Sequence, residues 1–139
     1  MTVAIDVDKL MGLVYKAVDE VGATLNAALV VMGDRLGYYQ ALADHGAATP
    51  AELAERTSTD EHYTREWLNA QAAGGLVEYD ASTGRFTLPP EQTVALTDPT
   101  SPAYLPGFFQ IALGTVQHTT ETIEAAPQRR RRGLARAHL

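Results

Sequence analysis

The chain has 139 residues, no cysteine and a formal net charge of −6 at pH 7, a length that fits one ordinary domain with extensions. The lack of cysteine excludes disulfides and thiolate metal sites, and the N-terminus, with Asp6 and Asp8, lacks the basic start and apolar run of a signal peptide. The longest apolar stretch, residues 27–33, falls short of the roughly 20 residues of a membrane span, so we expect a cytoplasmic protein that does not enter membranes.

Apolar residues at helical spacing predict two N-terminal helices. The i, i+3, i+4 pattern from about residue 6 to residue 19 indicates an amphipathic helix. The run from about residue 23 to residue 32 is apolar on nearly every side, which indicates burial on more than one side. In so small a domain, a second copy of the chain is the natural partner to bury these apolar sides. We therefore expect a homodimer in which these helices are exchanged or packed across a two-fold axis.

The next part of the chain predicts a helix-turn-helix. Residues 34–43 continue the helical pattern, and residues 49–52 (Thr-Pro-Ala-Glu) are a helix start with a capping threonine, a proline at the first helical position and a glutamate that completes a capping box. After a polar turn, a longer helix from about residue 60 to residue 73 ends at two glycines. A short helix, a turn and a longer helix form a helix-turn-helix.

Short alternating segments then predict a β-hairpin wing. Residues 76–79 and 85–88 alternate, and residues 80–84 between them are typical turn residues. Beyond the wing, residues 91–96 are expected to form one or two helical turns, and a long helix is expected from about residue 106 to residue 125.

The predicted fold class is mainly α: a winged helix-turn-helix with a small β-hairpin wing, preceded by dimerisation helices and followed by a long helix. The domain division is residues 1–33 for the dimerisation helices, 34–97 for the winged helix-turn-helix, 98–126 for a linker and the C-terminal helix, and 127–139 for an arginine-rich tail.

Charge is distributed unevenly between the body and that tail. Residues 1–126 contain all 17 acidic residues and six of the 11 basic ones, whereas the tail holds Arg129 to Arg132 and Arg136 and no acid. Because an acidic body repels the phosphate backbone, we expect the body to be a poor DNA ligand. The tail has no useful apolar period, so we expect it to be disordered when free.

Several segments also carry a resemblance to a known family. They are residues 31–39 (VMGDRLGYY), 53–57, 63–75 (YTREWLNAQAAGG), 77–79, 87–90 and 101–107. Over roughly residues 20–125 the chain resembles the N-terminal winged-helix domain of bacterial class I S-adenosylmethionine-dependent methyltransferases that are often described as transcriptional regulators. The resemblance implies that the helical N-terminus and the winged helix build a dimer and help to roof the substrate pocket. It also implies that a following Rossmann-like domain binds S-adenosylmethionine.

The sequence departs from that family after residue 126. A Rossmann-like domain needs a strand, a glycine-rich turn and a helix, then an acidic residue at the end of the next strand, and residues 127–139 supply none of these. We therefore expect a truncated chain without methyltransferase activity or a cofactor site of its own, and the tail has the composition of an out-of-frame gene end. The expected partners are a second copy and either the missing methyltransferase domain or a full-length paralogue.

The alternative function is a small winged-helix DNA-binding transcriptional regulator. In that case Arg65, on the second helix of the helix-turn-helix, and Arg85, in the wing, are the candidate DNA contacts. We favour a surface or interface role for both. Asp60, Glu61 and Glu66 share the helix of Arg65 and would face phosphates.

Aromatic residues supply the other candidate sites. Tyr104, Phe108 and Phe109 cluster at a predicted helix entrance, where they would line a substrate pocket or form an interface with the missing domain. Tyr63 and Trp67 can form an aromatic wall for a ligand, but their i, i+4 spacing favours ordinary core packing.

We predict no catalytic constellation and no metal site. The histidines have no second histidine or carboxylate at a recognised metal spacing, and no thiol joins them. They are His45, His62, His118 and His138.

Overall fold

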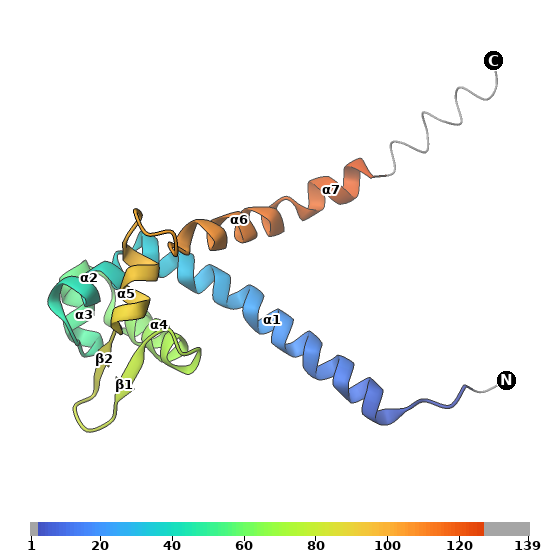
Figure 1. The fold of residues 1–139 in the computed structure, drawn as a ribbon, viewed down its shortest axis with the longest axis horizontal. Coiled ribbons are helices and arrows are strands. Elements are labelled where there is room, and N and C mark those ends of the chain that lie inside the picture. The colour runs from blue at the N-terminus through green and yellow to red at the C-terminus, as the bar shows by residue number, and fades with distance from the viewer. Residues whose placement is uncertain (1–2, 127–139) are drawn as a thin grey trace, which may run out of the picture.

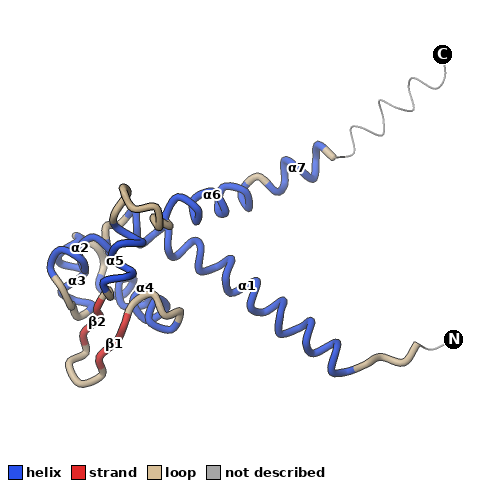
Figure 2. The backbone as a smooth tube through the Cα atoms, viewed as in Figure 1, coloured by secondary structure: helices blue, strands red, loops and turns tan. Residues whose placement is uncertain are grey.

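A computed structural model describes residues 3–126, which form seven helices and one two-stranded hairpin (Figure 1, Figure 2). The prediction of a mainly helical winged helix is confirmed. In chain order the elements are α1 (Val7–Arg35), α2 (Tyr38–His45), α3 (Pro50–Thr57), α4 (Glu61–Ala73), β1 (Glu78–Asp80), β2 (Arg85–Thr87), α5 (Pro90–Thr97), α6 (Pro106–Gln117) and α7 (Thr119–Ala125).

The N-terminal region is a single helix of 29 residues, so the prediction of two helices is wrong. Asp6 caps α1 by accepting a hydrogen bond from the backbone N–H of Lys9 at 3.2 Å. Gly22 lies in the middle of α1 and does not interrupt it, because one glycine costs a long helix only about 1 kcal/mol. The helix ends before Gly37, whose φ of 77° turns the chain into α2.

The helix-turn-helix is formed by α3 and α4, as the sequence predicts. The side chain of Thr49 accepts from the N–H of Glu52 at 3.3 Å, and the Glu52 carboxylate accepts from the N–H of Thr49 at 3.0 Å, which completes the predicted capping box. Ser58, at φ 56°, makes the turn, and Asp60 caps α4 by accepting from the N–H of Tyr63 at 3.1 Å.

The wing is the antiparallel pair of β1 and β2, with Tyr79 opposite Phe86. Gly84, at φ 69°, closes the turn between the strands. The backbones of Ala48 and Phe86 exchange hydrogen bonds of 3.0 and 2.8 Å. These bonds tie the wing to the loop before α3.

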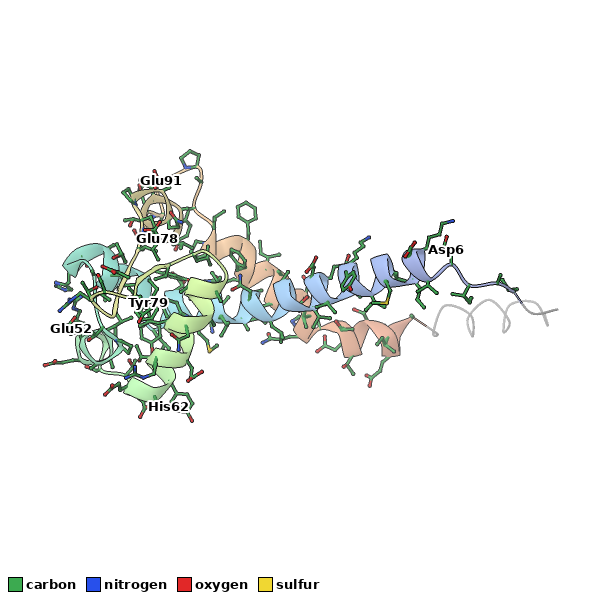
Figure 3. The ribbon with its side chains drawn as sticks, turned by 90° about the horizontal axis from the view of Figure 1, so that it is seen from below. Asp6, Glu52, His62, Glu78, Tyr79 and Glu91 are labelled. Atoms are coloured by element: carbon green, nitrogen blue, oxygen red, sulfur yellow. The ribbon has the colours of Figure 1, made fainter. Side chains whose placement is uncertain are left out.

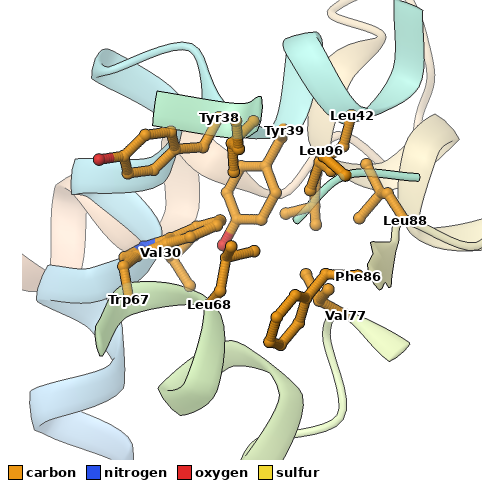
Figure 4. Packing of buried hydrophobic residues seen from close by; sticks show 12 residues of the cluster. Val30, Tyr38, Tyr39, Leu42, Trp67, Leu68, Val77, Phe86, Leu88 and Leu96 are labelled. Carbon is orange, nitrogen blue, oxygen red and sulfur yellow. The ribbon is translucent and has the colours of Figure 1, made fainter. Parts of the chain in front are cut away.

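A hydrophobic core joins α1, α2, α3, α4, α5 and the wing (Figure 4). The ring of Trp67 contacts those of Tyr38 and Tyr39 at centroid distances of 4.6 and 5.1 Å, and its Nε1 donates to the carbonyl of Leu29 at 2.8 Å. The buried residues of this core are Val30, Tyr38, Tyr39, Leu42, Ala48, Leu53, Trp67, Leu68, Val77, Phe86, Leu88 and Leu96.

Two helical arms extend from this body and diverge from each other (Figure 1). One is the N-terminal part of α1, and the other is α6 followed by α7; α6 packs against the C-terminal half of α1. The sequence predicts one long helix here, but the structure breaks it at His118, where a run of residues with low helix propensity begins. No helix among the described residues is long and apolar enough to cross a membrane.

Candidate functional site

The exposed face of α4 is the surface that a DNA-binding winged helix would present to the duplex. Arg65 on this face is half exposed, and its Nη2 lies 2.7 Å from Oε1 of Glu61, one helical turn earlier. Glu66 is also exposed on α4. The face therefore combines one ion-paired arginine with two carboxylates, which repel phosphates.

Arg85 lies in β2 and bridges the wing to α3. Its Nη1 and Nη2 donate to Oε2 and Oε1 of Glu52 at 2.6 and 2.7 Å, a two-point ion pair, and Nη1 also donates to the carbonyl of Ala47 at 3.3 Å. The hydrogen bond from the backbone of Thr49 and the bonds from Arg85 hold the pKa of Glu52 below its usual value. Arg85 thus links the wing to α3 and to the loop before it.

Arg56 is a third arginine of the winged helix, and the sequence reasoning did not single it out. Its guanidinium donates to the carbonyls of Gly46 and Ala47 at 2.9 and 3.3 Å. Arg56 and Arg85 therefore converge on the same loop before α3. The only available signal was that Arg56 follows the capping glutamate by four residues.

The structure separates the three aromatic candidates near α6. Phe109 is partly buried and packs against the core, whereas Phe108 is 68% exposed and Tyr104 is half-buried in the loop before α6. Burial, and secondarily the charge of Asp34, raises the pKa of the Tyr104 phenol.

Phe109 does line an apolar hollow between α1 and α6, with a volume of about 270 Å³. Small side chains on α1 leave this space, because alanine and threonine fill less of the gap between the helices than larger residues would. The lining residues are Ala23, Thr24, Ala27, Phe109, Ala112, Leu113 and Val116.

Tyr63 and Trp67 differ in burial although they lie one turn apart on α4. Trp67 is 5% exposed and belongs to the core, as predicted, whereas Tyr63 is 74% exposed, so core packing is wrong for Tyr63. Both line an apolar groove of about 220 Å³ between α1 and α4, which we call the α1–α4 groove. Its lining residues are Leu29, Met32, Leu36, Tyr38, Tyr63, Glu66 and Trp67.

The projecting part of α1 carries a continuous row of exposed apolar side chains, which we call the α1 stripe. Their exposed fractions range from 38% to 65%, and a contiguous apolar surface of this kind marks an interaction site. Figure 3 shows α1 extending away from the winged-helix body, with Asp6 at its far end. The α1 stripe consists of Val7, Leu10, Met11, Val14, Val18, Val21 and Leu25.

The comparisons with known proteins identify the family. Residues 23–98, more than half of the chain, match the model of the Rv2258c-like winged HTH domain. The chain belongs to this family. The match covers the C-terminal part of α1, the helix-turn-helix, the wing and α5. No curated protein matches the sequence.

Three solved structures share the fold of the Rv2258c-like domain. PigF with SAH has a TM-score of 0.59 at 20% identity, over 70% of this chain and 28% of its own. The mitomycin 7-O-methyltransferase MmcR has a TM-score of 0.63 at 22% identity, over 78% and 30% of the two chains. Human N-acetylserotonin methyltransferase in complex with SAM has a TM-score of 0.63 at 17% identity, over 90% and 36%. The chain thus spans about a third of the length of these proteins.

The described part of this winged helix contains no cluster of possible metal ligands and no parallel sheet. Among residues 3–126, no three histidine, aspartate or glutamate side chains gather as metal ligands. The sheet formed by these residues is one antiparallel hairpin, whereas a Rossmann-like cofactor site requires parallel strands and a glycine-rich turn. The candidate surfaces among the described residues are the apolar hollow between α1 and α6, the α1–α4 groove and the α1 stripe.

Proposed function

We propose that this winged helix is the dimerisation and substrate-capping module of an S-adenosylmethionine-dependent methyltransferase, and that residues 3–126 do not perform the chemistry themselves. The fold likeness to MmcR and to human N-acetylserotonin methyltransferase supports the proposal. The observation that carries it is that both arms present apolar faces that the described part of the chain does not cover.

The dimerisation part of the proposal rests on the α1 stripe. Val18, Val21 and Leu25 are each at least 60% exposed on a helix that extends away from the body. Burying one such side chain contributes about 1.5–3 kcal/mol, so several of them provide a strong driving force for association. A homodimer satisfies this requirement with a single chain type.

The capping part rests on α6. Phe108 and Ile111, three residues apart on one face of α6, are 68% and 70% exposed, and we assign this face to the catalytic domain of the methyltransferase. The hollow at Phe109 is open and smaller than the roughly 300–1,000 Å³ of a typical ligand pocket. A catalytic domain seated on α6 would supply the missing walls around an apolar part of the methyl acceptor.

The test combines the module with a paralogue that has the same winged helix and a catalytic domain. We expect native mass spectrometry to detect a heterodimer, and calorimetry to detect S-adenosylmethionine binding only when the paralogue is present. Phe108→Asp with Ile111→Asp is expected to change the KM for the methyl acceptor and leave dimer mass unchanged. Gln117→Asp, an exposed position elsewhere on α6, is the charge control. Cofactor binding by the module alone would overturn the proposal.

The winged helix itself favours a second candidate, a DNA-binding regulator. Titration of duplex DNA at low salt decides between the two, since phosphate contacts strengthen as salt is lowered. We expect no binding, because the exposed face of α4 is acidic and Arg85 is paired with Glu52. Salt-dependent binding that weakens in Arg65→Ala would favour the regulator.

A further inference from the structure

The apolar face of α1 does not end where the helix joins the body. Met32 and Leu36 follow Leu25 at intervals of seven and four residues, which keeps them on the face of the α1 stripe. They remain 44% and 46% exposed. The same face therefore runs along all of α1, for about 45 Å at 1.5 Å per residue.

The two ends of this face differ in their surroundings. At the N-terminal end α1 projects away from the body, and no other described element packs beside it (Figure 1). At the other end the face is bordered by α4, and Met32 and Leu36 line the α1–α4 groove with Tyr63 and Trp67. One end of the apolar face is therefore an exposed single helix, and the other end is part of an apolar groove.

We infer that two copies of the chain pair their α1 helices antiparallel, so that the first turns of one α1 lie in the α1–α4 groove of the other copy. The midpoint of Val7 and Leu36 lies between residues 21 and 22, so the two-fold axis passes beside Val21. This register sets Met11 against Met32 of the second copy, and Val18 against Leu25. The inference rests on the proposed dimerisation and specifies its geometry.

Spacing and symmetry identify a second copy as the occupant. Val7, Val14 and Val21 recur every seven residues, as do Met11, Val18 and Leu25, and this repeat is typical of helices that pair with other helices along a seam. A two-fold antiparallel pair covers the bare end and the groove of both copies with one contact, because each surface recurs in the partner. A parallel pair would place both bodies at one end of the seam.

The arrangement also explains the exposure of Tyr63. In the single chain this ring is 74% exposed beside an apolar groove. The arm of a second copy would cover it. The covered flank belongs to α4, so dimer formation would also restrict the approach of nucleic acid to the helix that a DNA-binding winged helix inserts into the major groove.

Disulfide trapping tests the register directly, because the chain has no cysteine of its own. Met11→Cys and Met32→Cys are made as separate variants, both at exposed positions. We expect a disulfide-linked dimer when the two are mixed and none from either alone, since a disulfide needs Cα atoms within about 7 Å of each other. On one helix these positions are about 31 Å apart, which excludes a link within a chain.

The control replaces Met11→Cys by Lys9→Cys, which lies within one turn but on the other side of α1. Its side chain is 87% exposed, so the thiol is accessible. We expect no link between Lys9→Cys and Met32→Cys. Circular dichroism confirms that each variant is folded.

Three other results would contradict the inference, and each identifies which part of it fails. Disulfide-linked dimers of Met11→Cys alone indicate a parallel pair of α1 helices. They overturn the antiparallel register, while dimerisation stands. A dimer by sedimentation with no link between Met11→Cys and Met32→Cys overturns the proposed register, while dimerisation stands. A monomer at all concentrations overturns both the register and the dimerisation part of the proposed function.

Discussion

Arg85 in the wing and Glu52 in α3 form a two-point ion pair, with nitrogen–oxygen distances of 2.6 and 2.7 Å, between residues 33 positions apart. The same Glu52 carboxylate accepts the backbone N–H of Thr49 and so completes the N-terminal cap of α3. One carboxylate therefore fixes both the start of α3 and the position of the wing. This arrangement makes the stability of the winged helix depend on the charge of Glu52.

The pH dependence of unfolding follows from this pair. The pKa of Glu52 is lowered in the folded state, so the ionised carboxylate stabilises the fold above the usual value of 4.5, and this contribution is lost as the pH falls through the lowered pKa. We expect Glu52→Gln to be less stable than the wild type at neutral pH, and this difference in stability to shrink as the pH falls through the lowered pKa of Glu52. Urea unfolding across this range measures the difference, and a constant difference would contradict the assignment.

Arg65 provides the contrast to Arg85. Its pair with Glu61 is an i, i+4 contact on an exposed helix face, and such pairs contribute about 0.3–0.5 kcal/mol. Arg65→Ala is therefore expected to lower the free energy of unfolding by less than about 0.5 kcal/mol. Arg85→Ala is expected to lower it more, because it also removes the bond to the Ala47 carbonyl and frees Glu52. Equal effects of the two substitutions in urea unfolding would show that the wing does not depend on Arg85.

Local signals predicted much of this fold. The capping box at Thr49 and Glu52, the glycine end of α4 and the turn of the wing all act within a few residues, so the sequence alone is sufficient. The continuity of α1 was missed because an apolar run beside an amphipathic run resembles a second helix. The two runs form one helix because no proline lies between them and Gly22 alone does not interrupt it.

The candidate sites were harder to predict, since they depend on contacts between distant parts of the chain. The spacing of Tyr63 and Trp67 places both on one side of α4, but it does not show how much of that side the other helices cover. In the structure Trp67 is buried in the core and Tyr63 is exposed. Neighbouring residues such as Phe108 and Phe109 point in different directions on a helix, and here Phe109 packs against the core whereas Phe108 is exposed. The partnership of Arg85 with Glu52 has no local signal.

At Gly33 the backbone of α1 passes close to the rings of Trp67 and Tyr39. A Cβ atom there would collide with the ring atoms of Trp67 and Tyr39, and neither ring has room to move because both are buried. Gly33→Ala is expected to destabilise the fold by about 1–3 kcal/mol, the usual cost of overpacking a core. Thermal unfolding measures the loss.

Gly12 is the matched control for this substitution. It lies in the same helix, and a Cβ at this position would meet nothing within 4 Å. Gly12→Ala is expected to stabilise the protein slightly or leave it unchanged, because alanine is the better helix former by about 1 kcal/mol. Equal destabilisation by both substitutions would mean that the close packing of Gly33 against Trp67 does not determine stability.

The last prediction concerns Val18, which is 62% exposed near the middle of the α1 stripe. If this face is a dimer interface, Val18→Asp places a charge in an apolar seam, and losing the burial of one valine costs about 1.5 kcal/mol or more. The dimer Kd is then expected to rise at least about tenfold, since each 1.4 kcal/mol is a factor of ten. Lys16→Asp adds a carboxylate on the other side of the same helix and is expected to change the Kd far less. Sedimentation equilibrium gives both constants, and an unchanged Kd for Val18→Asp would place the interface elsewhere.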